Sequence, residues 1–391
     1  MWFDNGPAQS GTSCVLAETL FLLSIAIILY VYVGHPLVVY LLARLRPCGW
    51  SQADVPLSVA VYISAFNEER GIRRKIQNLL EQDYQMPYTI VVANDGSSDG
   101  TADIVRSFGD PRIVLHDFKR NRGKAAMQNE VVPTLAHDIV IFSDATAVWP
   151  KDAIRKIARN FHEPQVGCVA VDLLFVSERN GVVERGQSAY WKYERFLRKY
   201  GALVKTNIVA SGATYAIRRS LFAPIREDIG EDLSNPLRIA MMGMRVVFDP
   251  DVVVEETSSS THTSELKMRT RIAVRNVTGL ASYFKYLRPR YGFAAYQLLV
   301  HKYLRVFCWA PLIVALVTNF VLRNVAPFGY LLIAHVTMYA LALIGYINTK
   351  LGKKSRFTYL FYYFMLLNYT CMIGFINYVQ GVRRPTWAPE R

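Results

Sequence analysis

The sequence predicts an α/β domain with a mostly parallel sheet, inserted between membrane-spanning helices. Between residues 54 and 265, short apolar runs typical of strands alternate with amphipathic stretches typical of helices. This is the pattern of parallel strands joined by crossover helices. Long apolar segments flank this region on both sides, and the chain is 52% hydrophobic with a mean hydropathy of +0.15. That composition is too apolar for an ordinary soluble enzyme.

The charge and the cysteines narrow the class of protein. A formal net charge of +14 suits either nucleic acid or an anionic lipid surface. No RNA-binding or zinc motif accompanies the charge, so we expect a lipid bilayer as the partner and no nucleic acid. The five cysteines are odd in number and scattered, and none forms a CxxC pair. Neither a disulfide framework nor a zinc site is therefore predicted.

Residues 1–50 are predicted to form a membrane anchor. The run from Leu20 to Leu42 holds no charged residue and is long enough to cross about 30 Å of hydrocarbon. A buried helix of a soluble core is the less favoured alternative. Arg44 and Arg46 follow at once, which places the next domain in the cytosol. The residues before the run lack the basic start of a secretory signal, so we expect the anchor to be retained, with a kink at His35-Pro36.

Five strand-like runs are expected in the α/β domain. They are LSVAVYIS, YTIVVAN, RIVLHDF, HDIVIFSD and VGCVAVDLLF, separated by amphipathic stretches such as ERGIRRKIQNLLEQ. Ligands of parallel sheets gather where the strands end at their carboxyl edge. The candidate functional residues are therefore sought directly after these runs.

The C-terminal part is predicted to return to the membrane. Residues 266–300 mix basic and aromatic residues, which favours amphipathic interface helices, although a solvated helix fits as well. Residues 301–391 hold three further spans, Tyr303–Leu322, Ala326–Ile347 and Phe357–Gln380, and a tail. Counting four crossings puts LGKKSR inside but leaves the basic tail GVRRPTWAPER outside, against the positive-inside tendency, unless one segment is re-entrant.

Polar residues follow the first two strands of the predicted sheet. The first run ends in SAFNEER, with Ser64, Phe66 and Glu68, and the second ends in NDGSSDGT, with Asp95 and Gly96. A carboxylate in such a turn can accept a hydrogen bond from a base or a ribose. Taken alone, the first motif also fits a helix cap and the second an ordinary turn. Their order along the chain favours a binding site.

Two later motifs add charge to the same edge of the sheet. RNRGKAAMQN supplies Lys124 and Arg122, and a Gly-Lys beside a sheet edge suits a diphosphate, although a surface lysine is the simpler alternative. IVIFSDATAVWP ends an apolar strand with Asp144, where a charge is costly unless it meets a cation or hydrogen-bond donors. A divalent metal would satisfy this carboxylate.

The motifs SAFNEE, NDGSSDGT, RNRGKAAMQN and FSDA, in this order and spacing, resemble the donor-binding half of family 2 glycosyltransferases over roughly residues 56 to 280. The resemblance is to membrane-embedded members that act as exopolysaccharide, poly-N-acetylglucosamine or hyaluronan synthases. It implies a Rossmann-like GT-A domain over residues 54–265 and a nucleotide-sugar donor, with UDP as the expected nucleotide. It also implies donor-binding roles for Ser64, Phe66, Glu68, Asp95, Gly96, Lys124 and Asp144.

The resemblance implies a metal cofactor as well. The family usually carries Asp-x-Asp after the FSDA strand, where carboxylates hold the Mg²⁺ or Mn²⁺ that bridges the donor diphosphate. Here the motif reads Asp144-Ala145-Thr146, so Asp144 and Thr146 are the expected ligands. Thr146 offers only a neutral oxygen. We therefore expect weaker metal binding, a water in place of the acid, or recruitment of another residue.

Two further segments match the acceptor and base motifs of the family. NIVASGATYAIRR resembles its acceptor segment, in which Ser211, Gly212 and Ala213 leave room for an incoming hydroxyl. DIGEDLSNPLRIAMM places an acidic pair at a helix start, where the family carries its catalytic base. Asp232 matches that position and Glu231 is second choice, although a helix cap is the alternative. A single base of this kind implies inversion at the transferred sugar.

The acceptor stays open between two classes. Arg275 matches the arginine of the Gln-x-x-Arg-Trp motif of processive members, where it would contact diphosphate, but Asn276 replaces the tryptophan. A lipid-headgroup role for this arginine is the alternative. The acceptor is either a polyprenyl-linked saccharide or a growing polysaccharide that the helices extrude, in an inner or plasma membrane. Candidate partners are a second copy of the chain and an export complex. A non-catalytic nucleotide-sugar-binding scaffold is less favoured, because Asp95, Asp144 and Asp232 are all present.

Overall fold

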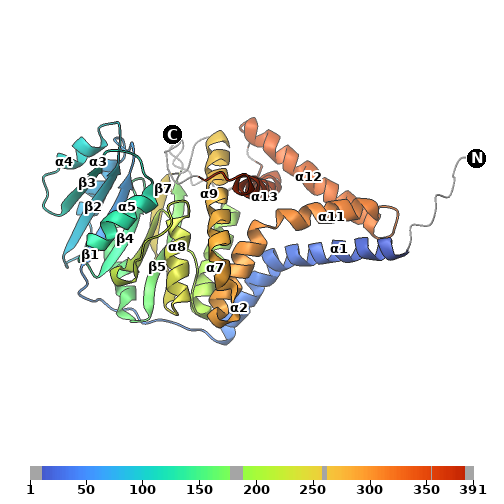
Figure 1. The fold of residues 1–391 in the computed structure, drawn as a ribbon, viewed down its shortest axis with the longest axis horizontal. Helices are drawn as coiled ribbons and strands as arrows, with labels where there is room; N and C mark the ends of the chain where they lie inside the picture. Colours follow the sequence, from blue (N-terminus) through green and yellow to red (C-terminus); the bar gives the residue numbers. More distant parts are fainter. Residues whose placement is uncertain (1–10, 177–187, 258–261, 354, 384–391) are drawn as a thin grey trace, which may run out of the picture. The chain divides into compact units, whose positions relative to one another are not determined.

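The computed structural model describes residues 11–176, 188–257, 262–353 and 355–383 (Figure 1). The chain divides into two compact units by its contacts. The helical unit comprises Met1–Val38 and Val300–Ile373, and the α/β unit comprises Val39–Leu299 and Gly374–Arg391.

One sheet of seven strands forms the centre of the α/β unit in the described residues. The order is β3-β2-β1-β4-β6-β5-β7, in which β6 runs antiparallel to β4 and β5 and the remaining pairs are parallel. The predicted mostly parallel sheet is confirmed. The strands are β1 (Val59–Ala65), β2 (Tyr88–Asp95), β3 (Ile113–Phe118), β4 (Ile139–Asp144), β5 (Val166–Val176), β6 (Thr214–Arg218) and β7 (Arg245–Thr257).

Helices cover both faces of this sheet. Ile76 of α3 and Ile154 of α6 join one core cluster with Ile63 of β1. Because side chains alternate along a strand, Tyr62 points to the opposite face, where its ring lies 5.7 Å from that of Phe142. The helices of this unit are α3 (Ile72–Leu80), α4 (Thr101–Arg106), α5 (Lys124–Val131), α6 (Ala153–Arg159), α7 (Ser188–Val204), α8 (Glu231–Met241), α9 (His262–Tyr283) and α10 (Gly292–Gln297), with 3-10 turns at Val132–Thr134, Asn160–His162, Arg219–Leu221, Phe284–Leu287 and Pro289–Tyr291.

The register of the strands gathers the predicted motifs at one edge. Ser64 of β1 pairs with Ala93 of β2 on one side and with Asp144 of β4 on the other. Since β6 is antiparallel to β4, its first residue, Thr214, lies at the same edge beside Ser143. Motifs far apart in the sequence therefore meet where the parallel strands end.

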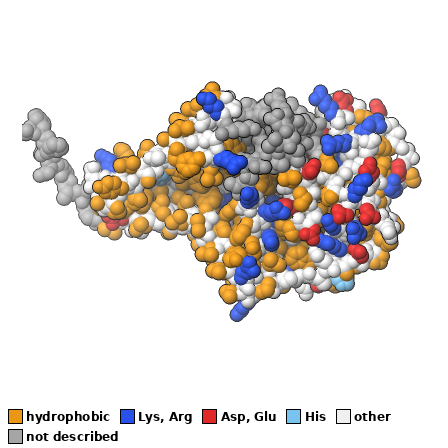
Figure 2. Space-filling model, turned by 180° about the vertical axis from the view of Figure 1, so that it is seen from behind, with side chains coloured by type: hydrophobic (Ala, Val, Ile, Leu, Met, Phe, Trp, Pro, Cys, Tyr) orange, Lys and Arg blue, Asp and Glu red, His pale blue; other side chains and the backbone are white. Residues whose placement is uncertain are grey.

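Three helices among the described residues are long and apolar enough to cross a membrane, namely Ser13–Leu45, Phe328–Lys350 and Arg356–Val379. They overlap three of the predicted spans. The first contains α1 (Gly11–Leu29), a π-helix (Tyr30–Gly34) and α2 (His35–Leu45), and the other two are α12 and α13. Hydrophobic side chains cover most of the visible surface of these helices, whereas charged side chains gather over the α/β unit (Figure 2).

The predicted span over Tyr303–Leu322 is interrupted in the structure and stays a candidate crossing. The structure has a π-helix (Leu298–Leu304) and then α11 (Trp309–Val321), and the two helical stretches are bent by 54°. Pro311 explains the break, because a proline lacks the N–H that would continue the helix and is tolerated in a first turn. The described residues thus provide three candidate crossings, or four if the bent pair counts as one.

The predicted interface segment, residues 266–300, begins within α9. This helix packs on α8, since a Cβ placed on Gly279 would lie 3.0 Å from Ile229 and 3.1 Å from Leu233. After α13, Arg383 Nε lies 3.9 Å from Asp228 Oδ2 within the α/β unit. The remaining tail residues, from Arg384 on, lie outside the described residues.

Candidate active site

The turns after β1 and β2 are fastened to each other. The backbone N–H of Glu68 donates to Thr101 Oγ1 at 2.8 Å, and Asn67 Oδ1 accepts from the backbone N–H of Ser98 at 2.8 Å. Asn67 has a φ of +54°, a conformation that asparagine tolerates better than most residues. The SAFNEE and NDGSSDG motifs therefore form one continuous surface. The predicted donor-binding side chains of the first motif are buried or half-buried within it: Ser64, Phe66 and Glu68.

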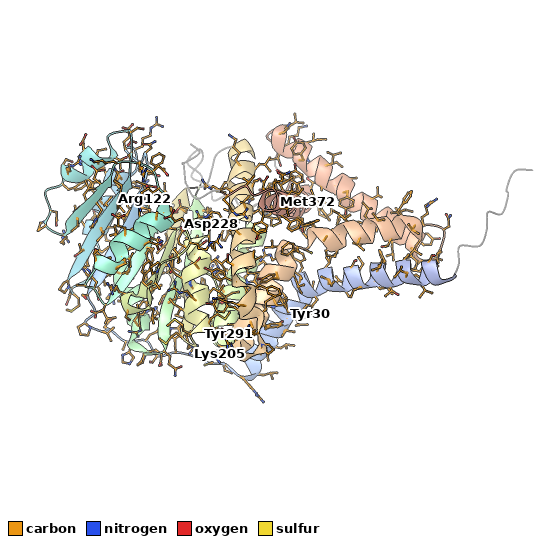
Figure 3. The ribbon with its side chains drawn as sticks, viewed as in Figure 1. Tyr30, Arg122, Lys205, Asp228, Tyr291 and Met372 are labelled. Carbon is orange, nitrogen blue, oxygen red and sulfur yellow. The ribbon has the colours of Figure 1, made fainter. Side chains whose placement is uncertain are left out.

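Asp95 organises the next loop. Its two carboxylate oxygens accept the backbone N–H groups of Arg122, labelled in Figure 3, and Gly123 at 2.7 and 2.8 Å. Burial raises the pKa of Asp95, against the effect of these two bonds. Gly96 has a φ of +71°, and a Cβ there would lie 2.6 Å from the backbone of Arg120. Only glycine fits this position without strain.

Lys124 and Asp144 form an ion pair through Nζ and Oδ1. Burial lowers the pKa of Lys124, but Asp144 and Glu231 outweigh burial, so the pKa is raised and the side chain carries a positive charge. The structure thus brings together the predicted phosphate-binding cation and the predicted metal-binding acid.

Glu231 and Arg275 form a second ion pair. Arg275 Nη2 donates to Glu231 Oε2 at 3.2 Å and to the carbonyl of Ile229 at 2.6 Å. Burial raises the pKa of Glu231, but the positive charges of Arg275 and Lys124 outweigh burial and lower it. Arg275 Nε is buried and has no hydrogen-bond partner among the described residues. Glu231 is therefore a charged anchor for Arg275, which keeps one donor unused.

Asp232 faces a different neighbour, the predicted acceptor segment Ser211–Ala213. A Cβ placed on Gly212 would lie 3.8 Å from Asp232 Oδ2. On the other side of this segment, the carbonyl of Ala213 accepts the backbone N–H of Asp144 at 3.1 Å. Asp232 is half-buried, and Ser211 and Ala213 are buried. The segment therefore lies against the Asp232 carboxylate on one side and the backbone of Asp144 on the other.

Two charged residues of the site were missed by the sequence analysis. Thr146 Oγ1 donates to Glu256 Oε1 at 2.5 Å, and Lys75 Nζ donates to the carbonyl of Ala147 at 2.7 Å. Burial and the charge of Asp144 raise the pKa of Glu256 to about 7, and burial lowers the pKa of Lys75 to about 7. In the sequence, Glu256 could have been found by the pattern that marks Asp144, because it too is an acid at the end of an apolar run.

The oxygens at this edge suit a divalent cation. Glu256 Oε2 is shielded from solvent and has no hydrogen-bond partner among the described residues. Thr146 Oγ1 is bonded to the other oxygen of Glu256, and the charge of Asp144 acts on this carboxylate. Carboxylate and hydroxyl oxygens are ligands that Mg²⁺ and Mn²⁺ prefer. No group of three or more His, Cys, Asp or Glu side chains that could hold a metal exists in the described residues. Mg²⁺ in proteins is commonly held by one or two carboxylates together with substrate phosphates.

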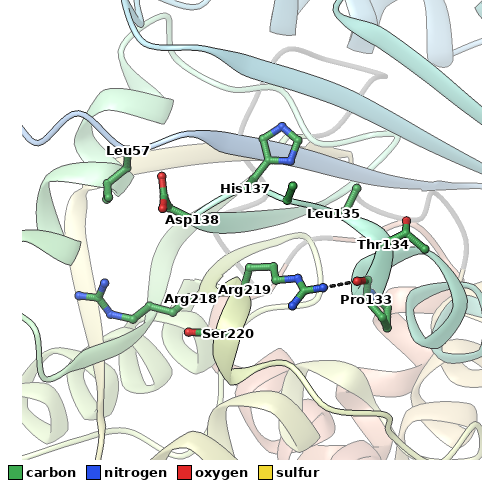
Figure 4. A pocket seen from close by; sticks show the side chains of 10 residues that line it. Leu57, Pro133, Thr134, Leu135, His137, Asp138, Arg218, Arg219 and Ser220 are labelled. Atoms are coloured by element: carbon green, nitrogen blue, oxygen red, sulfur yellow. Dashed lines mark hydrogen bonds between the residues drawn. The ribbon is translucent and has the colours of Figure 1, made fainter.

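A pocket outside the candidate active site lies at the other ends of the strands (Figure 4). It has a volume of about 520 Å³ and is lined by Leu57, His137, Asp138 and Arg218, among others. The Arg218 guanidinium is bound by the carbonyls of Val166, Phe161 and Glu163. This pocket borders the amino ends of β1 and β4, away from the predicted motifs.

Comparison with known proteins adds a family match. A family model described as "Glycosyltransferase like family 2" matches residues 56–279. The chain is 26% identical over 228 residues to an N-acetylglucosaminyltransferase of Azorhizobium caulinodans, covering 52% of this chain and 56% of that protein. It is 23% identical over 199 residues to the poly-beta-1,6-N-acetyl-D-glucosamine synthase of Staphylococcus aureus, covering 49% and 48%. The chain spans about half the length of these curated relatives.

A solved structure confirms the fold over nearly the whole chain. The mannosyltransferase PcManGT from Pyrobaculum calidifontis, in complex with GDP-Man and Mn²⁺, has a TM-score of 0.71 at 24% identity. The match covers 93% of this chain and 99% of that one. The predicted GT-A type of α/β fold is therefore confirmed.

Proposed function

The chain belongs to glycosyltransferase family 2, and on that premise we propose that it transfers a sugar, with inversion, from a nucleotide-sugar donor to a membrane-associated saccharide acceptor. The observation that carries this proposal is the place of Ser211–Ala213 between Asp144 and Asp232. An acceptor hydroxyl at this segment would then lie between a donor held at Asp144 and the general base Asp232.

The donor side of the site is assigned by chemistry. The nucleobase and the ribose of the donor would be held at the ends of β1 and β2 by Ser64, Phe66, Glu68, Asp95 and Gly96. Lys124 and the unused Nε–H of Arg275 would bind the diphosphate, because charge-assisted hydrogen bonds to phosphate are strong. Since both curated relatives are named for N-acetylglucosamine, UDP-N-acetylglucosamine is the first donor to test.

A divalent cation, Mg²⁺ or Mn²⁺, is proposed at Asp144 and Thr146. When bound, such an ion stabilises the negative charge of the departing diphosphate. Lys124 already neutralises one oxygen of Asp144 and would release it toward the substrate phosphates. Excess chelator should therefore lower turnover, and full activity in excess chelator would contradict a metal requirement.

In the proposed step, one Asp232 oxygen takes the proton of the acceptor hydroxyl. The hydroxyl oxygen bonds to the anomeric carbon from the face opposite the diphosphate, and the bond from that carbon to the diphosphate oxygen breaks. The products are the glycosylated acceptor, a nucleoside diphosphate and a protonated Asp232. An α-linked donor therefore gives a β-linked product. Glu231 does not take this proton in the proposal, because its ion pair with Arg275 lowers its pKa.

The acceptor is proposed to be membrane-associated, either a polyprenyl-linked saccharide or a growing polysaccharide that the same chain extrudes. The candidate spans support a position at the membrane. The catalytic domain is proposed to lie in the cytosol, because Arg44 and Arg46 follow the first span. The division into an anchor (1–50), a GT-A domain (54–265), interface helices (266–300) and C-terminal spans (301–391) is part of this proposal. A second copy of the chain or an export complex is a further proposed partner.

Nucleotide release tests the proposed function. The purified full chain, reconstituted with membrane lipids, is incubated with a panel of UDP- and GDP-sugars, and released nucleotide and product mass are measured. We expect release with one donor and a product longer than its acceptor by whole sugar units. No release with any donor would contradict the proposal and favour a nucleotide-binding scaffold.

A further inference from the structure

The metal-binding motif of this chain lacks an acid at position 146, and the structure places another acid against that position. Thr146 Oγ1 donates to Glu256 Oε1 at 2.5 Å, although 110 residues separate them in sequence. The side chain that stands where the family carries a carboxylate is thus bonded to a carboxylate from another strand.

The end of β7 is fixed beside the loop after β4 by backbone hydrogen bonds. The N–H of Val148 donates to the carbonyl of Glu255 at 2.8 Å, and the N–H of Glu255 donates to the carbonyl of Val148 at 3.0 Å. Since side chains alternate along a strand, Glu255 and Glu256 point to opposite sides. Glu255 is exposed and Glu256 is half-buried. Glu256 therefore reaches the site because of its strand register.

The two oxygens of the Glu256 carboxylate have different surroundings. Oε2 is shielded from solvent and makes no hydrogen bond among the described residues. Leaving a buried polar atom without a hydrogen bond is unfavourable, and more so for a charged group. Such an oxygen is satisfied by a proton or by a cation.

Lys124 and Lys75 attract the Glu256 carboxylate by their charge, and each donates a hydrogen bond to another group. Lys124 Nζ pairs with Asp144 Oδ1, and Lys75 Nζ donates to the carbonyl of Ala147 and lies 4.2 Å from the centre of the Trp149 ring. A donor diphosphate would bring further negative charge to this edge. A divalent cation between the diphosphate and the two carboxylates would offset that charge, and Mg²⁺ is commonly bound by one or two carboxylates plus substrate phosphates.

We propose that Glu256 is a ligand of the donor-bridging divalent cation and supplies, together with Asp144, the carboxylate that the sequence lacks at position 146. Thr146 positions this ligand through its hydroxyl, which holds Oε1 and leaves Oε2 for the metal. This inference rests on the proposed function for the presence of a nucleotide diphosphate, and it names a residue outside the four sequence motifs.

The test measures Mn²⁺ binding and does not depend on turnover. The full chain in detergent is titrated with Mn²⁺ at saturating UDP, and bound Mn²⁺ is followed by the loss of the free-ion signal in electron paramagnetic resonance. We expect Glu256→Gln to weaken Mn²⁺ binding at least 10-fold, since even outer partners of a metal ligand change affinity by about 10–100-fold. The matched control is Glu255→Gln, which removes the same charge one residue away and should stay within about twofold of the parent.

A second variant guards against a fold defect in the first. In Thr146→Asp/Glu256→Gln, the carboxylate moves to the position that the family uses, and we expect Mn²⁺ binding to recover to within about 10-fold of the parent. Parent-like Mn²⁺ affinity in Glu256→Gln, or an equal loss in Glu255→Gln, would overturn the assignment of Glu256. Donor turnover by the parent chain is measured separately. The proposed function can therefore fail while the Mn²⁺ result supports Glu256, and the assignment of Glu256 can fail while the chain turns over a donor.

Discussion

The two acids at the start of α8 have different neighbours, and this difference assigns them different roles. Asp232 faces Gly212 of the acceptor segment, whereas Glu231 is paired with Arg275. Asp232→Asn should therefore lower turnover by about 10²- to 10⁴-fold, the usual contribution of a general base, while UDP binding stays unchanged. Steady-state nucleotide release measures turnover, and UDP titration measures binding.

The matched control is Asp228→Asn. Asp228 is an acid on the same segment that pairs with Arg226, and this variant should turn over normally. Normal turnover by Asp232→Asn would remove Asp232 from the mechanism.

Glu231 should contribute to stability in a pH-dependent way. Its pKa is lowered in the folded chain by Arg275 and Lys124, so its contribution is complete above the unfolded value of about 4.5 and is lost as the pH falls through the folded value. Glu231→Gln should cost about 1–3 kcal/mol at pH 7, because Arg275 loses a charged partner. The melting temperatures of the parent and the variant, measured in detergent from pH 3.5 to 8, should differ by a constant amount above pH 5 and converge below pH 4.5. A gap that widens in acid would contradict the assignment.

Residues in motifs were predictable at this scale, and residues whose role depends on tertiary contact were not. Asp144 and Lys124 were predicted because each belongs to a motif with a fixed place in the order of strands. Lys75 is one of three cations in the stretch IRRKIQ, and the sequence does not indicate which of them is buried. Glu256 was missed because its partner, Thr146, lies on another strand end.

The turn between β2 and α4 shows how one element positions another. A Cβ on Gly96 would meet the backbone of Arg120, in the loop that Asp95 holds, whereas a Cβ on Gly109 would meet nothing within 4 Å. Both glycines have positive φ, +71° and +61°. Gly109→Ala should therefore lower the free energy of unfolding by about 1–2 kcal/mol, the cost of placing a Cβ on a residue with positive φ. Gly96→Ala should cost more and should weaken UDP binding at least 10-fold, as measured by melting temperature and calorimetric titration. Equal effects of both variants would show that the contact with Arg120 is not needed.

Strands were more predictable than helix ends. Alternating apolar runs and the carboxyl-end motifs indicated five of the strands directly, and β6 and β7 arise from the segments that resemble the acceptor and base motifs. The break before α11 was missed because hydropathy over a window does not register the backbone effect of a single residue such as Pro311.

For the whole molecule, the described contacts change the expected topology of the tail. Simple counting placed Arg383 on the outer side, yet it lies 3.9 Å from Asp228 of the α/β unit. Both residues must then lie on one side of a membrane. The basic loop LGKKSR before α13 is also expected inside. We therefore predict that α13 (Arg356–Val379) does not cross, although its length and composition would allow it.

Thiol labelling checks this topology. Cysteines replacing Lys353 and Gln380, both exposed, are reacted with a membrane-impermeant maleimide in intact and in permeabilised cells, and the exposed Cys48 of the α/β unit is the internal reference. Both new cysteines should react only after permeabilisation, as Cys48 does. Reaction of either one in intact cells, with Cys48 protected, would contradict the predicted arrangement.

The configuration of the product tests the central claim most directly. With an α-linked donor such as UDP-N-acetylglucosamine, the anomeric proton of the first product is measured by nuclear magnetic resonance before the product is extended. If Asp232 is the single general base, opposite a diphosphate held at Asp144, the parent chain should form a β-linked product. The variant Asp232→Asn should then form no such product. An α-linked product would contradict the single-displacement mechanism.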